Sequence, residues 1–275
     1  MAVVALWAGG ERRRWGAASW VWLGVGALVT AVLSGVVLPV GLVGVGAWAA
    51  VVALWVKSTR LRWLAAIGVL AGAAALMLHV VPGFVNPRVI ERVRFTEDAL
   101  PFSLYLNFDK TLVGLLLFGW ALPRIGTLKE WREMLRAALP RAVVTIGLVG
   151  LASWATGYVR WAPKLPEEAL LWCAVNLLST CVAEEAVFRG FVQGGLRRAW
   201  GRVRGGRWWA LGVAAVLFGL AHAGGGAAYV VLATMAGAGY GWVYERTQRV
   251  EASVLTHFAL NAVHFFLFTY PAVER

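Results

Sequence analysis

Three short polar clusters interrupt the apolar final third of the sequence. They read Glu184-Glu185-Ala186-Val187-Phe188-Arg189, Phe218-Gly219-Leu220-Ala221-His222 and His257-Phe258-Ala259-Leu260-Asn261. An ionised carboxylate at the centre of a bilayer costs about 2.5–3.5 kcal/mol even on insertion-derived scales. Two adjacent carboxylates inside an apolar run therefore require a structural or functional reason.

Helical spacing separates the two glutamates of the first cluster. Glu185 and Arg189 are four residues apart, so their side chains can pair on one helix face. Glu184 lies about 100° further round the helix and has no such partner on its own helix. We therefore expect Glu185 and Arg189 to form a supporting ion pair, and Glu184 to serve as a general base.

The other two clusters supply imidazole and amide groups. His257 and Asn261 are also four residues apart, so both project from one helix face into the same space. Asn261 is an uncharged donor of the kind that stabilises an oxyanion. His222, taken alone at a helix end, is more typical of a structural residue. We expect packing roles for His264, one turn beyond Asn261, and for the isolated His79.

The sequence lacks the catalytic motifs of three known kinds of intramembrane protease. None of the four histidines is followed by Glu, so the HExxH zinc-protease motif does not occur. The only aspartates, Asp98 and Asp109, fall in or near a predicted outer loop, which excludes an intramembrane aspartate pair. No GxSG motif surrounds a buried serine, which argues against a Ser/His dyad. A Glu, His, His and Asn set remains.

That set resembles a known family. EEAVFRG, FGLAH and HFALN are similar to the three motifs of the CPBP family, which comprises CAAX-protease and bacteriocin-processing membrane proteins. These motifs are usually written EExxxR, FxxxH, and HxxxN or HxxxB. They occur here in the family's order, over about residues 168–270. The resemblance implies a glutamic-type intramembrane protease of a bacterial inner or plasma membrane, with Glu185 and Arg189 bracing the first helix.

The resemblance also implies roles for the other matched residues. Glu184 with His222 would activate a water molecule, while His257 and Asn261 would form the oxyanion site. The family has also been described as metal-dependent. We expect no cofactor, but zinc is an open alternative, in which Glu184, His222 and His257 would be ligands with water as the fourth.

Two other functions compete with an intramembrane endopeptidase that hydrolyses a membrane-associated protein or peptide. One is a non-catalytic membrane binding or immunity protein of the same fold. The other is a transporter with a buried Glu/His relay. A pure binder has no need of all four of Glu184, His222, His257 and Asn261, and a transporter would favour inverted repeats, which the sequence lacks. We therefore favour the peptidase.

Composition explains where such a site must lie. Of 275 residues, 60% are hydrophobic and 15% charged, and the mean hydropathy is +0.69, whereas soluble domains carry about 25% charged residues. Sixteen tryptophans suit the membrane–water boundary. The net charge of +12 reflects basic loops that attract anionic lipid headgroups rather than nucleic acid.

The apolar runs predict an all-α, polytopic transmembrane bundle of about 8–9 spans. The nine candidates are 17–37, 40–56, 63–81, 104–122, 142–157, 168–188, 208–222, 227–244 and 252–270. Several are shorter than the roughly 20 residues that a crossing requires, especially 40–56, 142–157 and 208–222. An N-terminus in the cytoplasm places 19 of the 26 Lys and Arg residues inside, which predicts that orientation.

Two loops and one boundary complete the prediction. Residues 82–103 are expected to be irregular with a short interfacial helix. Residues 123–141 have the pattern of an amphipathic helix on the inner surface. We divide the chain into an N-terminal transmembrane region of unassigned function, 1–140, and a CPBP-like protease core, 141–275.

The predicted spans leave one geometric conflict. Counted along its span from the inner side, Glu184 lies roughly 9 Å deep and His222 about 21 Å deep. Helix tilt, or a segment 190–207 that sinks into the membrane, must close the difference of about 12 Å. Otherwise the two side chains cannot act together.

Overall fold

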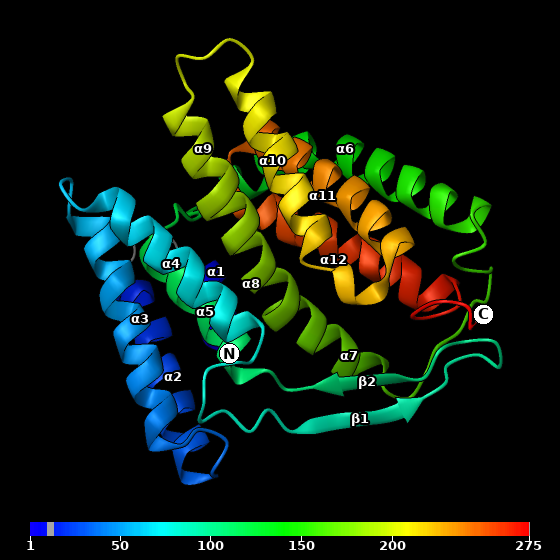
Figure 1. Ribbon diagram of the computed structural model, residues 1–275, viewed down its shortest axis with the longest axis horizontal. Coiled ribbons are helices and arrows are strands. Elements are labelled where there is room, and N and C mark those ends of the chain that lie inside the picture. Colours follow the sequence, from blue (N-terminus) through cyan, green and yellow to red (C-terminus); the bar gives the residue numbers. More distant parts are fainter. Residues whose placement is uncertain (10–13, 275) are drawn as a thin grey trace.

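The computed structural model describes residues 1–9 and 14–274 of the chain. The basic residues Arg12, Arg13 and Arg275, which the orientation argument uses, lie outside the described residues. Most of the described chain is helical (Figure 1). The α-helices are α1 (Ala2–Gly9), α2 (Arg14–Leu33), α3 (Pro39–Lys57), α4 (Arg62–Met77), α5 (Phe108–Trp120), α6 (Leu128–Ala155), α7 (Ala169–Val175), α8 (Val182–Glu185), α9 (Gly194–Ala199), α10 (Gly206–Leu220), α11 (Ala227–Thr247) and α12 (Val250–Leu267).

Four helices of the described chain are long and apolar enough to cross a membrane. They are Pro39–Lys57, Leu128–Ala155, Ala169–Ala199 and Val250–Leu267. Large apolar side chains such as Trp63, Leu64 and Ile67 are exposed on the surface, as expected of residues that face lipid. The protein is therefore a helical integral membrane protein, although the predicted count of 8–9 spans is not confirmed.

The segment Ala169–Ala199 is one continuous helix at the centre of the fold. It contains α7, α8 and α9, joined by two π-helical stretches, η1 (Asn176–Cys181) and η2 (Ala186–Gln193). In Figure 1 it runs between α2–α4 on one side and α10–α12 with α6 on the other. The predicted end of this span at 188 was wrong, so Glu184 lies near the middle of the helix and not close to its end.

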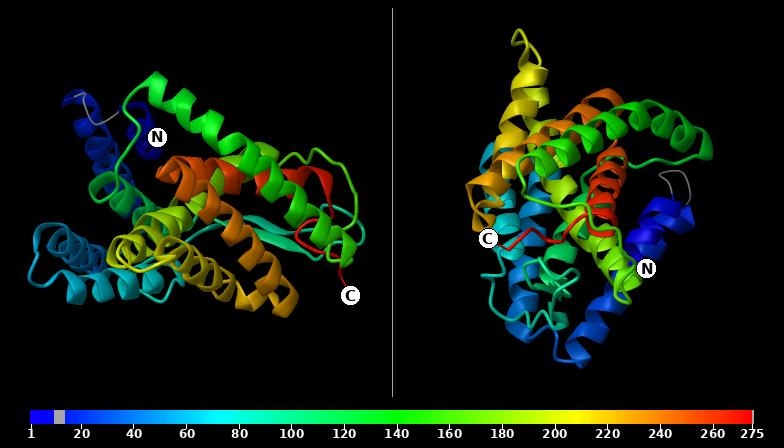
Figure 2. Two further views of the ribbon diagram at one scale, coloured as in Figure 1. Left: turned by 90° about the horizontal axis from the view of Figure 1, so that it is seen from above. Right: turned by 90° about the vertical axis from the view of Figure 1, so that its right-hand side faces the viewer.

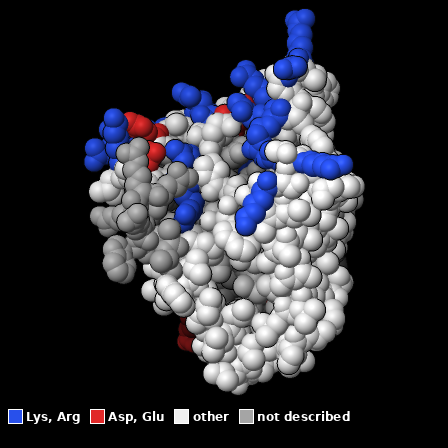
Figure 3. All heavy atoms as spheres, turned by 90° about the vertical axis from the view of Figure 1, so that its left-hand side faces the viewer, with Lys and Arg blue, Asp and Glu red and all other residues white. Residues whose placement is uncertain are grey.

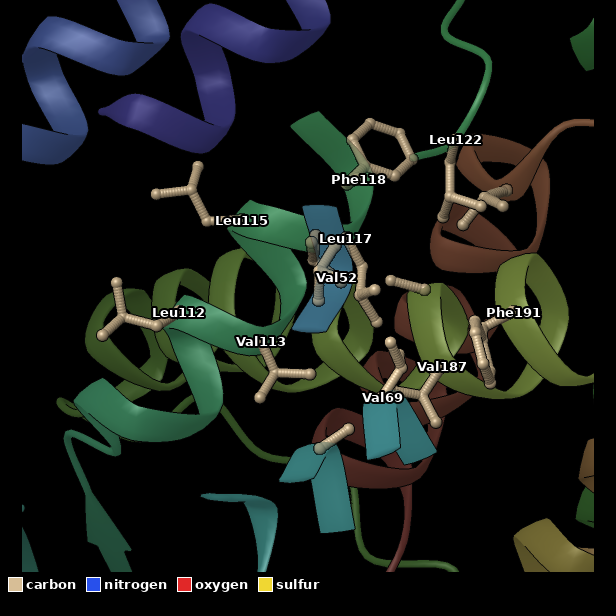
Figure 4. Packing of buried hydrophobic residues seen from close by; sticks show 14 of the residues in the cluster. Val52, Val69, Leu112, Val113, Leu115, Leu117, Phe118, Leu122, Val187 and Phe191 are labelled. Atoms are coloured by element: carbon tan, nitrogen blue, oxygen red, sulfur yellow. The ribbon is translucent and has the colours of Figure 1, made fainter. Parts of the chain in front are cut away.

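Helix α5 connects the front of the chain to this central helix. Its apolar residues pack in one cluster with Val52 of α3, Val69 of α4, and Val187 and Phe191 of η2 (Figure 4). Van der Waals packing, rather than water exclusion, holds helices together in lipid. Fixing α5 in this way sets the position of the residues at its N-terminal end.

The helices on the other side of the central helix pack closely through small residues. A Cβ atom at Gly219 of α10 would lie 1.9 Å from Thr234 Oγ1 and 2.8 Å from Val230 O, both in α11. Glycine is thus required for the approach of the two helices. Figure 2 shows α6 and α12 lying beside this pair. The tight approach fixes the end of α10, where His222 follows.

Parts of the predicted loop 82–103 are irregular, but a β-hairpin over residues 88–105 takes the place of the predicted short interfacial helix. Strands β1 (Arg88–Val93) and β2 (Phe102–Tyr105) pair antiparallel with two irregularities in register. The sequence RVIERV contains three β-branched residues, which favour a strand, and of its six residues only Ile90 is buried.

The predicted amphipathic helix 123–141 and the predicted span 142–157 are one helix, α6. It begins after Thr127, whose hydroxyl accepts a hydrogen bond from the Glu130 amide at 3.2 Å. It continues past Pro140 to Ala155. The boundary that we drew between residues 140 and 141 therefore lies inside this helix.

Lys and Arg residues gather at one end of the molecule (Figure 3). With the N-terminus in the cytoplasm, this end faces inward and includes the turn between α9 and α10. We predict that a single cysteine introduced as Arg202→Cys resists a membrane-impermeant maleimide in intact cells and reacts after permeabilisation. Labelling in intact cells would show that this turn faces outward and that the predicted orientation is wrong.

Candidate functional site

Glu184, His222 and His257 meet in the interior of the bundle. Glu184 Oε2 lies 3.9 Å from His222 Nε2 and 3.9 Å from His257 Nε2. The Glu184 side chain is 8% exposed. The depth conflict of the predicted spans is thus absent, because Glu184 occupies the middle of its helix and His222 follows the end of α10 from the opposite direction.

A residue that the sequence analysis did not select completes this group. Lys110 Nζ donates to Glu184 Oε1 at 2.7 Å, and the two side chains are 15% and 8% exposed. Glu184 is therefore paired with a cation from a helix outside the three motifs. Lys110 falls within the predicted span 104–122, and nothing in its local sequence identifies its partner.

Close contact between two helices brings Lys110 to Glu184. Gly114, one helical turn after Lys110, lies against the central helix. A Cβ atom there would lie 2.9 Å from Ala183 N and 3.0 Å from Ala183 Cα. A larger residue would push α5 away from the segment that carries Glu184, so Gly114 sets the length of the Lys110–Glu184 contact.

Hydrogen bonds on the far side of each imidazole determine which nitrogen faces Glu184. His222 Nδ1 lies 2.7 Å from Phe218 O, a carbonyl that can only accept, so Nδ1 carries the proton. His257 Nδ1 lies 2.8 Å from Glu185 Oε1 and donates to it. The Nε2 atom of each ring therefore faces Glu184 Oε2, which is itself buried without a hydrogen-bond partner in the described structure.

Glu185 and Arg189 form the ion pair expected from their spacing. Arg189 Nε lies 3.1 Å from Glu185 Oε2, and both side chains are fully buried. Arg189 also donates to Gly237 O at 3.1 Å, and its guanidinium lies 4.8 Å from the ring centre of Phe218. The pair thereby connects the central helix to α11 and orients His257 through Glu185.

We predict that Glu185→Gln and Arg189→Ala each lower the folded yield more than the rate of the folded protein. Removing one partner of a buried pair strands the other charge, at a cost of about 3–5 kcal/mol. Detergent-resistant monomer in size-exclusion chromatography measures the yield. Wild-type yield together with loss of turnover would assign both residues to the reaction itself.

Asn261 lies in the same cavity but contacts a different set of residues. Its Nδ2 donates to Asn176 Oδ1 at 3.2 Å, and Cys181 Sγ donates to the same oxygen at 3.3 Å. Asn176 stands at the start of the π-helical stretch η1. Cys181 and Cys173 are both free thiols.

The four predicted catalytic residues, Glu184, His222, His257 and Asn261, line one cavity of about 480 Å³. Other parts of its wall come from β2, α6 and α11. Aromatic residues on this wall include Tyr229, whose ring packs edge-on against His222 with centres 5.4 Å apart. The cavity is large enough for several residues of a peptide and is predominantly apolar, with a few convergent polar groups.

The remaining histidines have structural contacts. His264 Nε2 lies 3.2 Å from Thr269 O, as expected for a packing residue. His79 is not isolated, because its Nδ1 lies 2.8 Å from Asp109 Oδ2, and Asn86 donates to both oxygens of that carboxylate. Asp109 is buried rather than in an outer loop. This network holds the start of α5, and Lys110 follows immediately.

The zinc alternative can be compared with this geometry. Zinc bonds of about 2.0–2.1 Å place neighbouring ligand atoms about 3.3 Å apart. Here the Glu184 oxygen lies 3.9 Å from each imidazole nitrogen, and no group of three or more His, Cys, Asp and Glu within residues 1–9 and 14–274 has metal-ligand spacing. The Lys110 ammonium beside Glu184 also repels a cation. The residues as arranged do not fit the metal.

The structure thus places a carboxylate between two imidazoles inside an apolar helical bundle. Residues 166–263 match the family described as "Type II CAAX prenyl endopeptidase Rce1-like". This match supports the assignment of the segment to the CPBP/CAAX protease family and confirms the resemblance. No curated protein and no solved structure matches the chain.

Proposed function

We propose that the chain is an intramembrane endopeptidase that hydrolyses a peptide bond of a membrane-associated protein or peptide in a plasma or bacterial inner membrane. The observation that supports this most directly is the position of Glu184. One of its oxygens is held by Lys110, and the other faces two imidazole nitrogens. The CAAX-protease family match of the same segment points to the same chemistry.

In the proposed reaction, Glu184 is the general base. A water molecule within hydrogen-bonding distance, about 2.8 Å, of both Glu184 Oε2 and an Nε2 atom fits the 3.9 Å separation of these atoms. Glu184 takes one proton of the water as its oxygen attacks the scissile carbonyl. Lys110 holds the other carboxylate oxygen, so the base cannot turn away from the water.

The other residues act on the tetrahedral intermediate and the leaving group. His222 orients the water through Nε2. Protonated His257 donates from Nε2 to the oxyanion, because its Nδ1 already donates to Glu185. The second amide hydrogen of Asn261 is the other oxyanion donor. Glu184 then returns its proton to the leaving amine, which completes the hydrolysis.

Comparison of cleavage products in cells tests this function. Membrane extracts of cells that express the wild-type chain or Glu184→Ala are compared by N-terminal proteomics. We expect new N-termini within or beside the apolar segments of membrane proteins, present only with the wild-type chain. Identical sets of termini, with both proteins folded and equally abundant, would favour the non-catalytic binding alternative.

We predict that chelators leave the activity nearly unchanged. Because Lys110 compensates the charge of Glu184, the base requires no metal to remain ionised in the site. Purified protein is dialysed against EDTA and 1,10-phenanthroline and then assayed, with metal content measured in parallel. Loss of activity on chelation and its return with one equivalent of zinc would make Glu184, His222 and His257 ligands instead.

A further inference from the structure

Strand β2 forms one wall of the cavity that contains the proposed catalytic side chains. Phe102, Ser103, Leu104 and Tyr105 all line it. Successive side chains of a strand point to opposite faces, so one face of β2 would contribute only alternate residues. Since four consecutive residues line the cavity, an edge of β2 faces it.

This edge is the one that β1 does not occupy. The Leu106 amide donates across the hairpin to Pro87 O at 2.9 Å. Amide directions alternate along a strand, so the amides of Ser103 and Tyr105 point away from β1. Within the described chain, no backbone hydrogen bond joins Phe102–Tyr105 to an element other than β1. Figure 1 shows β2 on the side of the hairpin nearer to α7.

The hairpin is held in place by the C-terminal tail. Arg94 donates to both carboxylate oxygens of Glu274, at 2.6 and 2.9 Å, and these hydrogen bonds hold the pKa of the Glu274 carboxyl below its ordinary value. The Leu100 amide donates to Ala272 O at 3.0 Å. The free edge is therefore pre-formed, which reduces the entropy lost when a ligand binds it.

The edge also leads toward the proposed base. Tyr105, the last residue of β2, precedes by five residues Lys110, which contacts Glu184. Hydrolysis requires an extended segment, because a helix surrounds each peptide bond with its own side chains and hydrogen bonds. An extended peptide beside β2 could form backbone hydrogen bonds with β2 and lie in the cavity at the same time.

We propose that the substrate binds by strand addition, as an extended apolar peptide segment that pairs with the free edge of β2. The amides of Ser103 and Tyr105 donate to its carbonyl groups, and the cavity takes alternate side chains. The pairing continues toward Lys110 and places the scissile bond at Glu184. This inference rests on the proposed function and names how its substrate is held.

Photo-crosslinking tests strand addition without requiring cleavage. The full chain carrying Glu184→Gln is mixed in detergent micelles with a Leu/Ala peptide of about ten residues, long enough to form a strand, with benzoylphenylalanine at its centre. We expect the crosslinks to lie within residues 100–107. N-methylation of alternate peptide residues should lower labelling about tenfold for one of the two alternating sets and leave the other unchanged, since only one set of amides faces β2.

A protein variant gives a second measurement. Tyr105→Pro removes an outward amide, and its matched control Tyr105→Phe retains it. We expect labelling to fall about tenfold only with Tyr105→Pro. If that variant does not fold, the N-methylated peptides decide alone. Equal labelling by both methylated sets, or crosslinks confined to the helices, would overturn strand addition.

The outcomes also separate this inference from the proposed function. Cleavage by the wild-type chain with crosslinks away from β2 would refute strand addition and leave the peptidase intact. In the opposite case, crosslinking to β2 depends on which alternate peptide residues are N-methylated, but the wild-type chain cleaves no membrane protein. That result would support strand addition and refute the peptidase.

Discussion

Replacement of Glu184 by Gln is expected to lower the rate of peptide-bond cleavage by several orders of magnitude, about 10²–10⁴-fold, while the protein remains folded. Gln has the same shape, and its carbonyl oxygen can still accept a hydrogen bond from Lys110, so the 2.7 Å contact keeps a partner. Its amide cannot take a proton from water. Positioned general bases contribute about 10²–10⁴-fold to a rate, and we expect a loss in this range. The measurement is the rate of product formation per folded molecule.

Glu133→Gln is the matched control for this substitution. Glu133 is on α6 with its side chain 61% exposed, and it faces Lys129 at 4.0 Å. An exposed pair of this kind contributes little to stability, so both fold and rate should remain at wild-type values. Undiminished cleavage by Glu184→Gln would require another residue to be the base.

Replacement of Lys110 by Met is expected to lower kcat about 10²-fold with little change in KM. The effect on the rate should be of the size seen when one preorganised electrostatic group is removed from an active site. Met fills a similar volume but leaves Glu184 without its cation and free to turn. Since Lys110 contacts the base rather than the peptide, substrate binding should be nearly unchanged. Kinetics on the folded fraction separate the two parameters.

Two further variants distinguish positioning from a purely structural role. Lys110→Arg retains the charge and should recover most of the lost kcat, whereas Lys129→Met removes an exposed lysine and should have no effect. If Lys110 only stabilised the fold, Lys110→Met would reduce the amount of folded protein but not its kcat. That result would contradict the role proposed for the ammonium group.

The sequence alone predicted which polar residues of the central helix and of α12 share a helix face, because the signal for this is local. A carboxylate in an apolar run is costly wherever the helix lies, and a spacing of four residues places two side chains on one face in any helix. The Glu185–Arg189 pair therefore followed from the sequence, and it is present at 3.1 Å. That the chain is a membrane protein could also be predicted, because the hydrophobic content of the sequence does not depend on how the helices pack.

The tertiary structure alone decided which groups surround Glu184. Lys110 and Glu184 are 74 residues apart, and their contact depends on how closely α5 approaches the central helix at Gly114. His257 and Glu185 are 72 residues apart and meet through the crossing of two helices. Packing over such separations leaves no periodic signal in a single sequence. The hairpin edge at the cavity was also not predictable, because pairing between short strands depends on contacts with the rest of the fold.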